Sequence, residues 1–277
     1  MRARGRMDLR ALRDTPPWAW PEGTDTALLA VLRDGQAAGA DRLLAAELAG
    51  DFTVINEDLV EALLAIVRSS GASEKLRGQA AISLGPVLEY ADTEGFEDPD
   101  DVPISERTFE TIQEALRTLF RDAGVPVEVR RRILEASVRA PLAWHQDAVR
   151  AAYRSDDEAW KLTGVFCMRF VRGLDEEILE ALDSENPEIH YEAVGAAGAW
   201  GVEAAWPHIA ALLAKDGTER RLLLEAIEAV ATIRPREAPE VLADLADSDD
   251  EEIAEAVHEA LALADGTRGE ADEDEEL

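Results

Sequence analysis

The stretch NPEIHYEAVGAAGAW, residues 186–200, decides the fold. Asn186 suits a helix N-cap, and Pro187 suits the first helical position. Counted from Ile189, small or apolar residues follow at offsets of four, five, seven and eight, namely Ala193, Val194, Ala196 and Ala197. These offsets lie on one face of an α-helix, and the small side chains allow a neighbouring helix to approach closely. The stretch therefore predicts a tightly packed helix.

This spacing, here called the small-residue phrase, recurs along the chain. It begins at Leu76, Val129, Trp160, Ile189, Leu222 and Ile253, and the last five starts are 31, 29, 33 and 31 residues apart. A regular period of this length indicates a helical repeat array, in which neighbouring units bury each other's apolar faces. Hydrophobic residues make up 47% of the chain but aromatic residues only 5%, which favours packed helices over sheets. An all-α fold in one continuous array follows.

The residue pattern of the repeat resembles that of HEAT-like repeats, in particular the short bacterial kind of the phycobilisome lyase type. The resemblance rests on helices that open with Leu76-Arg77 or Val129-Arg130 and close near Leu84-Gly85 or Ala197-Gly198, and on partner helices such as PHIAALLAKDG at 207–217. It covers roughly residues 40–264 and is clearest over 186–264. The Trp, Leu-Gly and Tyr pattern of tetratricopeptide repeats, which have a similar period, is missing.

The resemblance implies a right-handed α-solenoid of about six to seven helical pairs. In such a fold the second helix of each pair, here helices such as 144–154 and 203–214, lines the concave side. We expect an extended N-terminal segment over 1–23, repeats over 24–264 with an acidic insertion loop at 91–104, and an acidic disordered tail over 265–277. The predicted helices are 24–33, 41–49, one capped by Asn56, one capped by Ser73, 105–122, 127–139, 144–154, 158–171, 175–182, 186–200, 203–214, 218–233, 237–245 and 250–264.

The formal net charge of -31 is the main compositional constraint on partners. It opposes the positive field that nucleic-acid binding requires, so we expect no nucleic-acid ligand. The charge is uneven, because residues 115–172 carry 11 basic and 7 acidic groups while residues 173–277 carry 6 and 30. A basic protein partner and an adaptation to salt are both consistent with this acidity. No stretch is apolar enough for a membrane helix, and the single Cys167 lies on the packed face of its phrase, so we expect a cytoplasmic protein.

The sequence contains no recognisable catalytic or metal-binding constellation, and we expect neither a cofactor nor a metal. Deoxyhypusine hydroxylase, a HEAT-repeat enzyme, holds two irons with repeated His-Glu pairs, but here only His258-Glu259 forms such a pair. The carboxylates at 174–177 and 248–252 lie where helices begin, where they complement the helix dipole. The arginines at 130–132 are expected to bridge acidic loops rather than bind a ligand.

Aromatic and basic residues on the partner helices are the candidates for contact with a partner, because Trp, Tyr and Arg are frequent interface anchors. They are Trp144, His145, Arg150, Tyr153, Arg154, Trp206 and His208. The alternative for each is packing, most clearly for Tyr153, which aligns with Leu213. We therefore predict a non-catalytic scaffold that binds a protein or peptide, possibly basic, on its concave surface. The competing hypotheses are an enzyme or assembly factor of the lyase type acting on a cofactor-bearing protein, and a purely structural or salt-adapted module.

Overall fold

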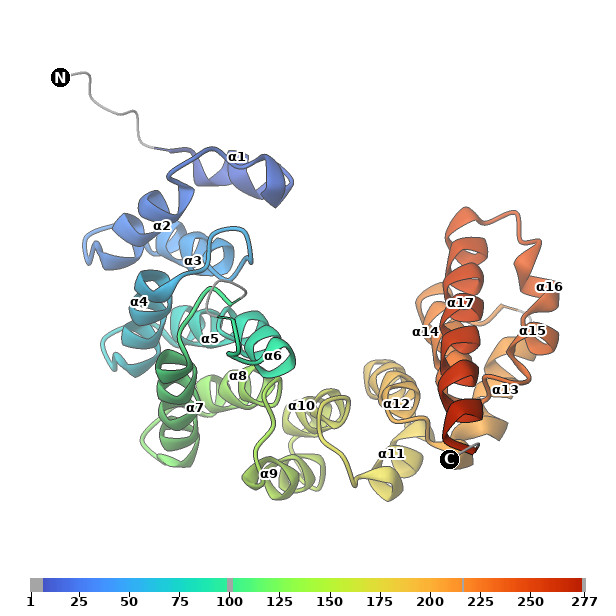
Figure 1. Ribbon diagram of the computed structural model, residues 1–277. Helices are drawn as coiled ribbons and strands as arrows, with labels where there is room; N and C mark the ends of the chain where they lie inside the picture. The colour runs from blue at the N-terminus through green and yellow to red at the C-terminus, as the bar shows by residue number, and fades with distance from the viewer. Residues whose placement is uncertain (1–6, 99–101, 216, 276–277) are drawn as a thin grey trace. The chain divides into compact units, whose positions relative to one another are not determined.

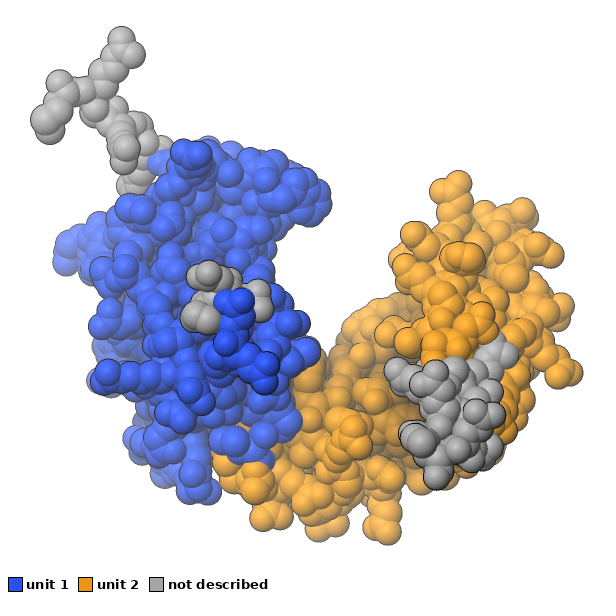
Figure 2. All heavy atoms as spheres, in the orientation of Figure 1, with its two compact units in different colours: residues 1–142 blue, residues 143–277 orange. Residues whose placement is uncertain are grey.

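The computed structural model describes residues 7–98, 102–215 and 217–275, with side chains in the last helix described as far as Gly266. Within these residues every regular element is a helix, as the sequence predicts. The chain divides into two compact units, Met1–Leu142 and Ala143–Leu277, which are coloured separately in Figure 2. Each unit is a stack of antiparallel helical pairs, and the fold is an all-α solenoid.

Unit 1 has two layers of helices. Helices α3, α5 and α8, the latter two of which contain the small-residue phrase, pack in succession, while α2, α4 and α7 pack in succession beside them (Figure 1). α6 packs against α8. The elements are α1 (Leu9–Arg13), η1 (Pro17–Ala19), α2 (Thr24–Arg33), α3 (Gly39–Leu48), α4 (Glu57–Arg68), α5 (Glu74–Ile82), α6 (Gly85–Glu94), α7 (Glu106–Arg121) and α8 (Val127–Ser137).

Unit 2 repeats this two-layered arrangement. Helices α10, α12, α14 and α17 carry the small-residue phrase and pack in succession; we call them the phrase layer. Their partners α9, α11, α13, α15 and α16 form the companion layer (Figure 1). The elements are α9 (Trp144–Tyr153), α10 (Glu158–Met168), α11 (Asp175–Leu182), α12 (Pro187–Ala199), η2 (Glu203–Ala205), α13 (Trp206–Ala214), α14 (Arg220–Ile233), α15 (Ala238–Val241), α16 (Ala243–Ala246) and α17 (Glu251–Glu275).

Small residues bring the helices of unit 2 unusually close together. A Cβ atom added to Gly164 of α10 would lie 2.6 Å from the backbone nitrogen of Tyr153 on α9. One added to Gly198 of α12 would lie 3.0 Å from Cα of Ala229 on α14. Cys167 is fully buried on α10, which confirms its predicted place in the core. The phrase is therefore a packing device, because any larger side chain would separate these helices.

Side-chain caps fix where several helices begin. Asn56, Ser73 and Asn186 accept hydrogen bonds from the backbone N–H groups of Leu59, Leu76 and Ile189, which confirms the three predicted caps. Asp250 accepts from the N–H groups of Glu252 and Ile253 in the same way. The acidic run at 248–252 thus contains a helix cap, as expected.

Three segments differ from the sequence expectation. In the segment 1–23, of which residues 1–6 lie outside the described part, α1 and η1 form, and the Trp20 indole N–H donates to the carbonyls of Leu12 and Thr15 at 2.9 Å each. In the segment 91–104, residues 91–94 extend α6, and Val102 and Ile104 are buried. These apolar side chains anchor a segment that the acidic composition had suggested to be entirely solvated.

The last helix also differs from its predicted extent. α17 continues to Glu275, whereas the sequence predicted a helix end near Ala264 and a disordered tail after it. Residues 265–275 contain no proline, so Gly266 and Gly269 weaken the helix there without breaking it. The disorder of the tail stays a prediction.

Candidate functional site

Unit 2 curves toward its phrase layer. Successive helices of this layer pack closely on one another, whereas the companion helices fan apart around them (Figure 1). The cause is steric, since Gly and Ala at the phrase positions shorten the distance between neighbouring helix axes. The expectation that helices 144–154 and 203–214 line the concave side is therefore wrong for this unit, because these helices, α9 and α13, belong to the companion layer.

The aromatic candidates on α9 mostly pack within unit 2. His145 is fully buried, and the half-buried Trp144 ring lies against it with the ring centroids 3.8 Å apart. Tyr153 is also buried, which confirms the packing interpretation of this residue. Burial, followed by the nearby Glu180 and Glu177 carboxylates, raises the pKa of Tyr153 to about 12. The phenol therefore stays protonated at neutral pH.

The basic candidates on α9 bind a buried carboxylate on α11. Arg150 Nε donates to Glu177 Oε1 at 2.7 Å, and Arg154 Nη2 donates to the same oxygen at 3.2 Å. Glu177 belongs to the acidic run at 174–177, which the sequence interpretation assigned only to the helix dipole. Its side chain is in fact 7% exposed and joins two companion helices through an ion pair.

The candidates on α13 meet a phrase-layer helix. His208 Nε2 lies 2.7 Å from Nε2 of His190 on α12, and the two rings are nearly perpendicular. Burial lowers the pKa of both histidines, and the neighbouring His208 lowers that of His190 further. Trp206 is half-buried at the start of α13. The seven candidates thus form two groups, on α9 and on α13, with α11 between them in the companion layer (Figure 1). Their role in partner binding stays a prediction.

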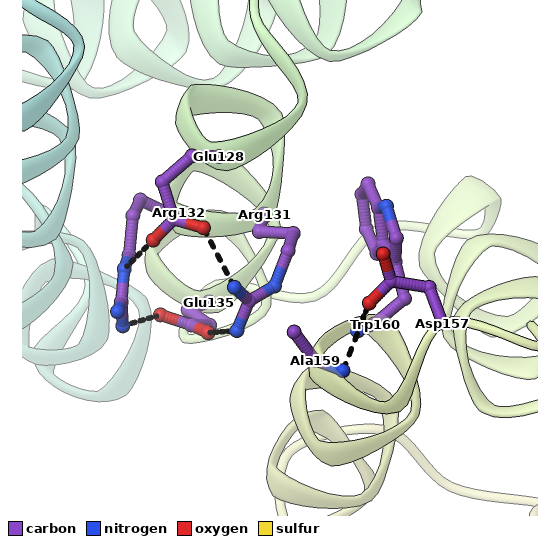
Figure 3. Close-up of polar contacts among 7 residues, drawn as sticks. All are labelled: Glu128, Arg131, Arg132, Glu135, Asp157, Ala159 and Trp160. Atoms are coloured by element: carbon purple, nitrogen blue, oxygen red, sulfur yellow. Dashed lines mark hydrogen bonds and ion pairs between the residues drawn. The ribbon is translucent and has the colours of Figure 1, made fainter.

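The arginine run of unit 1 is used within its own helix. Arg131 donates to Glu128 at 2.6 Å, and Arg132 donates to Glu128 at 3.1 Å and to Glu135 at 2.7 Å (Figure 3). These are (i, i+3) and (i, i+4) pairs on one helical face. Two of the three arginines therefore pair along α8, not with acidic loops as predicted. In unit 2, Figure 3 shows Asp157 capping α10 by accepting from the N–H groups of Ala159 and Trp160.

The phrase layer of unit 2 carries a charge network that the sequence did not reveal. Arg169, which follows α10, donates from Nε to Glu192 on α12 at 3.1 Å and pairs through Nη2 with Glu225 on α14 at 2.8 Å. The guanidinium passes directly over Gly195, where an added Cβ would lie 1.9 Å from Nη2. Glycine at this position is thus required for one arginine to reach both carboxylates.

An aromatic ring continues this network on α12. The Arg221 guanidinium carbon lies 3.6 Å from the ring centroid of Tyr191, within the range of a cation–π interaction. Nη1 of Arg221 also pairs with Glu188 at 3.1 Å. The positive charge of Arg221 is therefore already engaged by α12.

A groove of about 760 Å³ lies between α14 and α17 on the side of this network. Five of its lining residues are glutamates and one is an arginine, and its apolar residues come from both helices. The full set is Tyr191, Arg221, Leu224, Glu225, Glu228, Glu252, Glu255, Ala256, Glu259, Ala260 and Leu263. Burial, and then the Glu225 and Glu259 charges, raise the pKa of Glu228. The groove is therefore a region of concentrated negative charge with an apolar lining.

The type of repeat is identified by its similarity to a known family. Residues 176–262 match the family described as HEAT repeats. This chain carries HEAT repeats. The matched range runs from α11 to α17 and includes Glu192, Glu225 and the groove residues other than Leu263, whereas Arg169 precedes it. No match was found among curated proteins.

Solved structures with related helical arrangements are distant in sequence. Human deoxyhypusine hydroxylase in complex with glycerol is 18% identical, with 93% of this chain and 88% of that chain covered and a TM-score of 0.39. Escherichia coli YibA is 16% identical, with coverages of 92% and 85% and a TM-score of 0.47. An engineered protein is 16% identical, with coverages of 92% and 70% and a TM-score of 0.46. The identities are too low to transfer an activity to these HEAT repeats.

Residues 7–98, 102–215 and the described part beyond Gly217 contain no group of three or more His, Cys, Asp or Glu side chains placed to hold a metal ion. Among the same residues, none of the helices combines the length and apolar character needed to span a bilayer.

The residue spacing along α17 could have indicated one wall of the groove. Glu252, Glu255 and Glu259 are three and four residues apart, and Ala256, Ala260 and Leu263 follow the same spacing beside them. This pattern marks two adjacent stripes on one helix. In the sequence alone the acidity of this region looks like a bulk property, which hides its position on one helical face.

Proposed function

We propose that this HEAT-repeat protein is a non-catalytic scaffold that binds a basic protein or peptide on the phrase-layer face of unit 2. One observation carries the proposal, namely the groove between α14 and α17, whose glutamates outnumber its single arginine five to one. A positively charged partner is attracted to such a surface and oriented by it, mainly through a faster association rate. HEAT repeats commonly serve as surfaces for protein interactions, which is consistent with this role.

Affinity purification at low and high salt tests the proposal. Captured proteins are identified and then measured against the purified HEAT-repeat protein by isothermal titration. We expect a specific basic partner whose affinity falls as salt rises, because salt screens the charge attraction. Absence of any direct partner at either salt concentration would refute the proposed function. A metal or chromophore retained stoichiometrically by the purified protein would instead favour an enzyme or an assembly factor.

A further inference from the structure

We infer that the groove between α14 and α17 holds a basic amphipathic helix of the partner protein, its apolar side chains on the groove floor and its lysines or arginines against the glutamates. This inference rests on the proposed function, and it names the part of the partner that is recognised. Such an occupant requires a groove with uncompensated charge, an apolar floor and a suitable length.

Three of the five groove glutamates are uncompensated. Glu225 pairs with Arg169, and Glu252 pairs with Arg220. In contrast, Glu228, Glu255 and Glu259 form no ion pair with any residue of the described chain. Arg221 does not neutralise them, because it pairs with Glu188 and lies over the Tyr191 ring.

The Glu228 carboxylate is also repelled by neighbouring negative charges. The pKa of Glu228 is raised first by burial and then by the charges of Glu225 and Glu259, which shows that the negative charges are close enough to interact. A cationic side chain placed among them would relieve this repulsion and lower the pKa of Glu228 again. The site is therefore suited to lysine or arginine side chains, whereas a phosphate-bearing ligand would be repelled.

The floor of the groove is apolar. Leu224 of α14 faces Ala256, Ala260 and Leu263 of α17 across it. Leu263 is 50% exposed, so much of its side chain is open to contact by an apolar side chain of a partner. An entirely polar basic peptide would leave this floor uncovered, so the occupant needs an apolar stripe of its own.

The extent of the groove along α17 fits a short helix. From Glu252 to Leu263 the helix rises about 16 Å at 1.5 Å per residue, which corresponds to about three turns. The Ala and Leu residues on α17 are four and three apart, the spacing at which a second helix presents its own apolar side chains in register. An amphipathic helix of three to four turns matches both the length and this pattern.

The test uses a designed probe and two matched charge variants of the full-length protein. The probe is a fluorescent peptide of about 18 residues, with leucines at helical spacing on one face and lysines on the other; a scrambled peptide of the same composition is the comparison. The groove variant is Glu228→Gln, Glu255→Gln and Glu259→Gln combined. The control variant is Glu176→Gln, Glu203→Gln and Glu240→Gln combined, which removes the same charge from exposed companion-layer positions. Circular dichroism melting confirms that both variants fold.

We expect the groove variant to bind the probe about tenfold more weakly in fluorescence anisotropy, and the control variant to change its Kd less than twofold. The scrambled peptide should bind at least about tenfold more weakly than the probe. Leu263→Ser should weaken binding of the probe without altering the salt dependence of that binding. Equal losses in the two charge variants, or equal binding of the two peptides, would show non-specific attraction and overturn the inference.

The same variants separate this inference from the proposed function. If a basic partner is captured and binds the groove variant as tightly as the unaltered protein, the scaffold function stands and the groove assignment is wrong. Crosslinking from Leu263→Cys identifies what occupies the groove. A second copy of this chain, or an unfolded segment of the captured partner, would overturn the helix assignment.

Discussion

The two layers of unit 2 use charged and aromatic residues in opposite ways. In the companion layer, Arg150 and Arg154 share one buried carboxylate and His145 is buried beneath Trp144, so the conspicuous residues hold the fold together. In the phrase layer, glycines and alanines pack the helices around the Arg169 ion pairs, and further glutamates line an open groove. The candidate anchors on α9 therefore have contacts within the fold, and their role in partner binding stays a prediction.

This contrast shows that residue type alone does not separate packing from binding in a repeat protein. Tyr153 and Arg150 have the chemistry of interface anchors, yet their partners are other residues of unit 2. Glu255 and Glu259 look like ordinary solvated charges, yet they gather on one groove. What distinguishes the two groups is whether the charge is already compensated within the fold.

The largest effect is expected where the phrase layer buries charge. Arg169→Met leaves the Glu192 and Glu225 carboxylates, which are 15% and 8% exposed, without their ion-pair partner. We expect the free energy of unfolding to fall by about 3 kcal/mol, because an unpaired buried charge is costly. Urea denaturation measures this loss. Arg220→Met, which removes an exposed arginine paired with Asp250 and Glu252, is the control and should cost less than about 1 kcal/mol. Equal losses would contradict the distinction.

The next effect concerns the closest approach of the two layers. Gly164→Ala places a Cβ atom 2.6 Å from a backbone nitrogen of α9, which cannot move aside as a flexible side chain can. We expect a loss of about 1–3 kcal/mol in thermal or chemical denaturation. Gly266→Ala in α17 meets no atom within 4 Å and should stabilise the helix by about 0.5–1 kcal/mol. A neutral Gly164→Ala substitution would show that the α9–α10 contact is not tight.

A smaller effect should separate the two arginines that share Glu177. Arg150→Ala removes the shorter and less exposed contact and should cost about 1–2 kcal/mol, since Glu177 is buried. Arg154 is 67% exposed, and its replacement by alanine should cost less than about 0.5 kcal/mol. The difference in urea midpoint between the two variants is the measurement. The reverse order would mean that Arg154 is the main partner of Glu177.

The smallest expected effect is a change in pH dependence at the junction of α12 and α13. The pKa values of His190 and His208 are lowered below 6.5 by burial, so the unfolded chain binds more protons than the native one below that pH. The stability contributed by the neutral pair is complete above about pH 6.5 and is lost as the pH falls through the lowered native values. Combined His190→Gln and His208→Gln should flatten this part of a measured stability-against-pH curve. An unchanged curve would contradict the assignment.

The fold follows largely from the spacing of small residues, which is a local property of the chain. Asn186, Pro187 and the phrase after Ile189 specify a helix and the face it buries, and the structure confirms both. The direction of curvature is not local, because it depends on which of two layers packs more closely. The groove was also hidden, since Glu228 and Glu255 lie 27 residues apart and only the packing of α14 on α17 brings them together. Similarly, nothing near Arg169 in the sequence points to Glu225.

The position of Arg169 has a consequence for how unit 2 unfolds. Repeat proteins are usually described as chains of nearest-neighbour interactions, in which one repeat can melt while the next but one is unaffected. Arg169 follows α10 and pairs with α14, passing across α12 at Gly195. This contact couples a helix to its second neighbour, so that fraying of α12 also breaks the link between the helices on either side. Because Gly195 leaves room for this contact, we expect α10, α12 and α14 to unfold together, where a simple array would allow them to open one at a time.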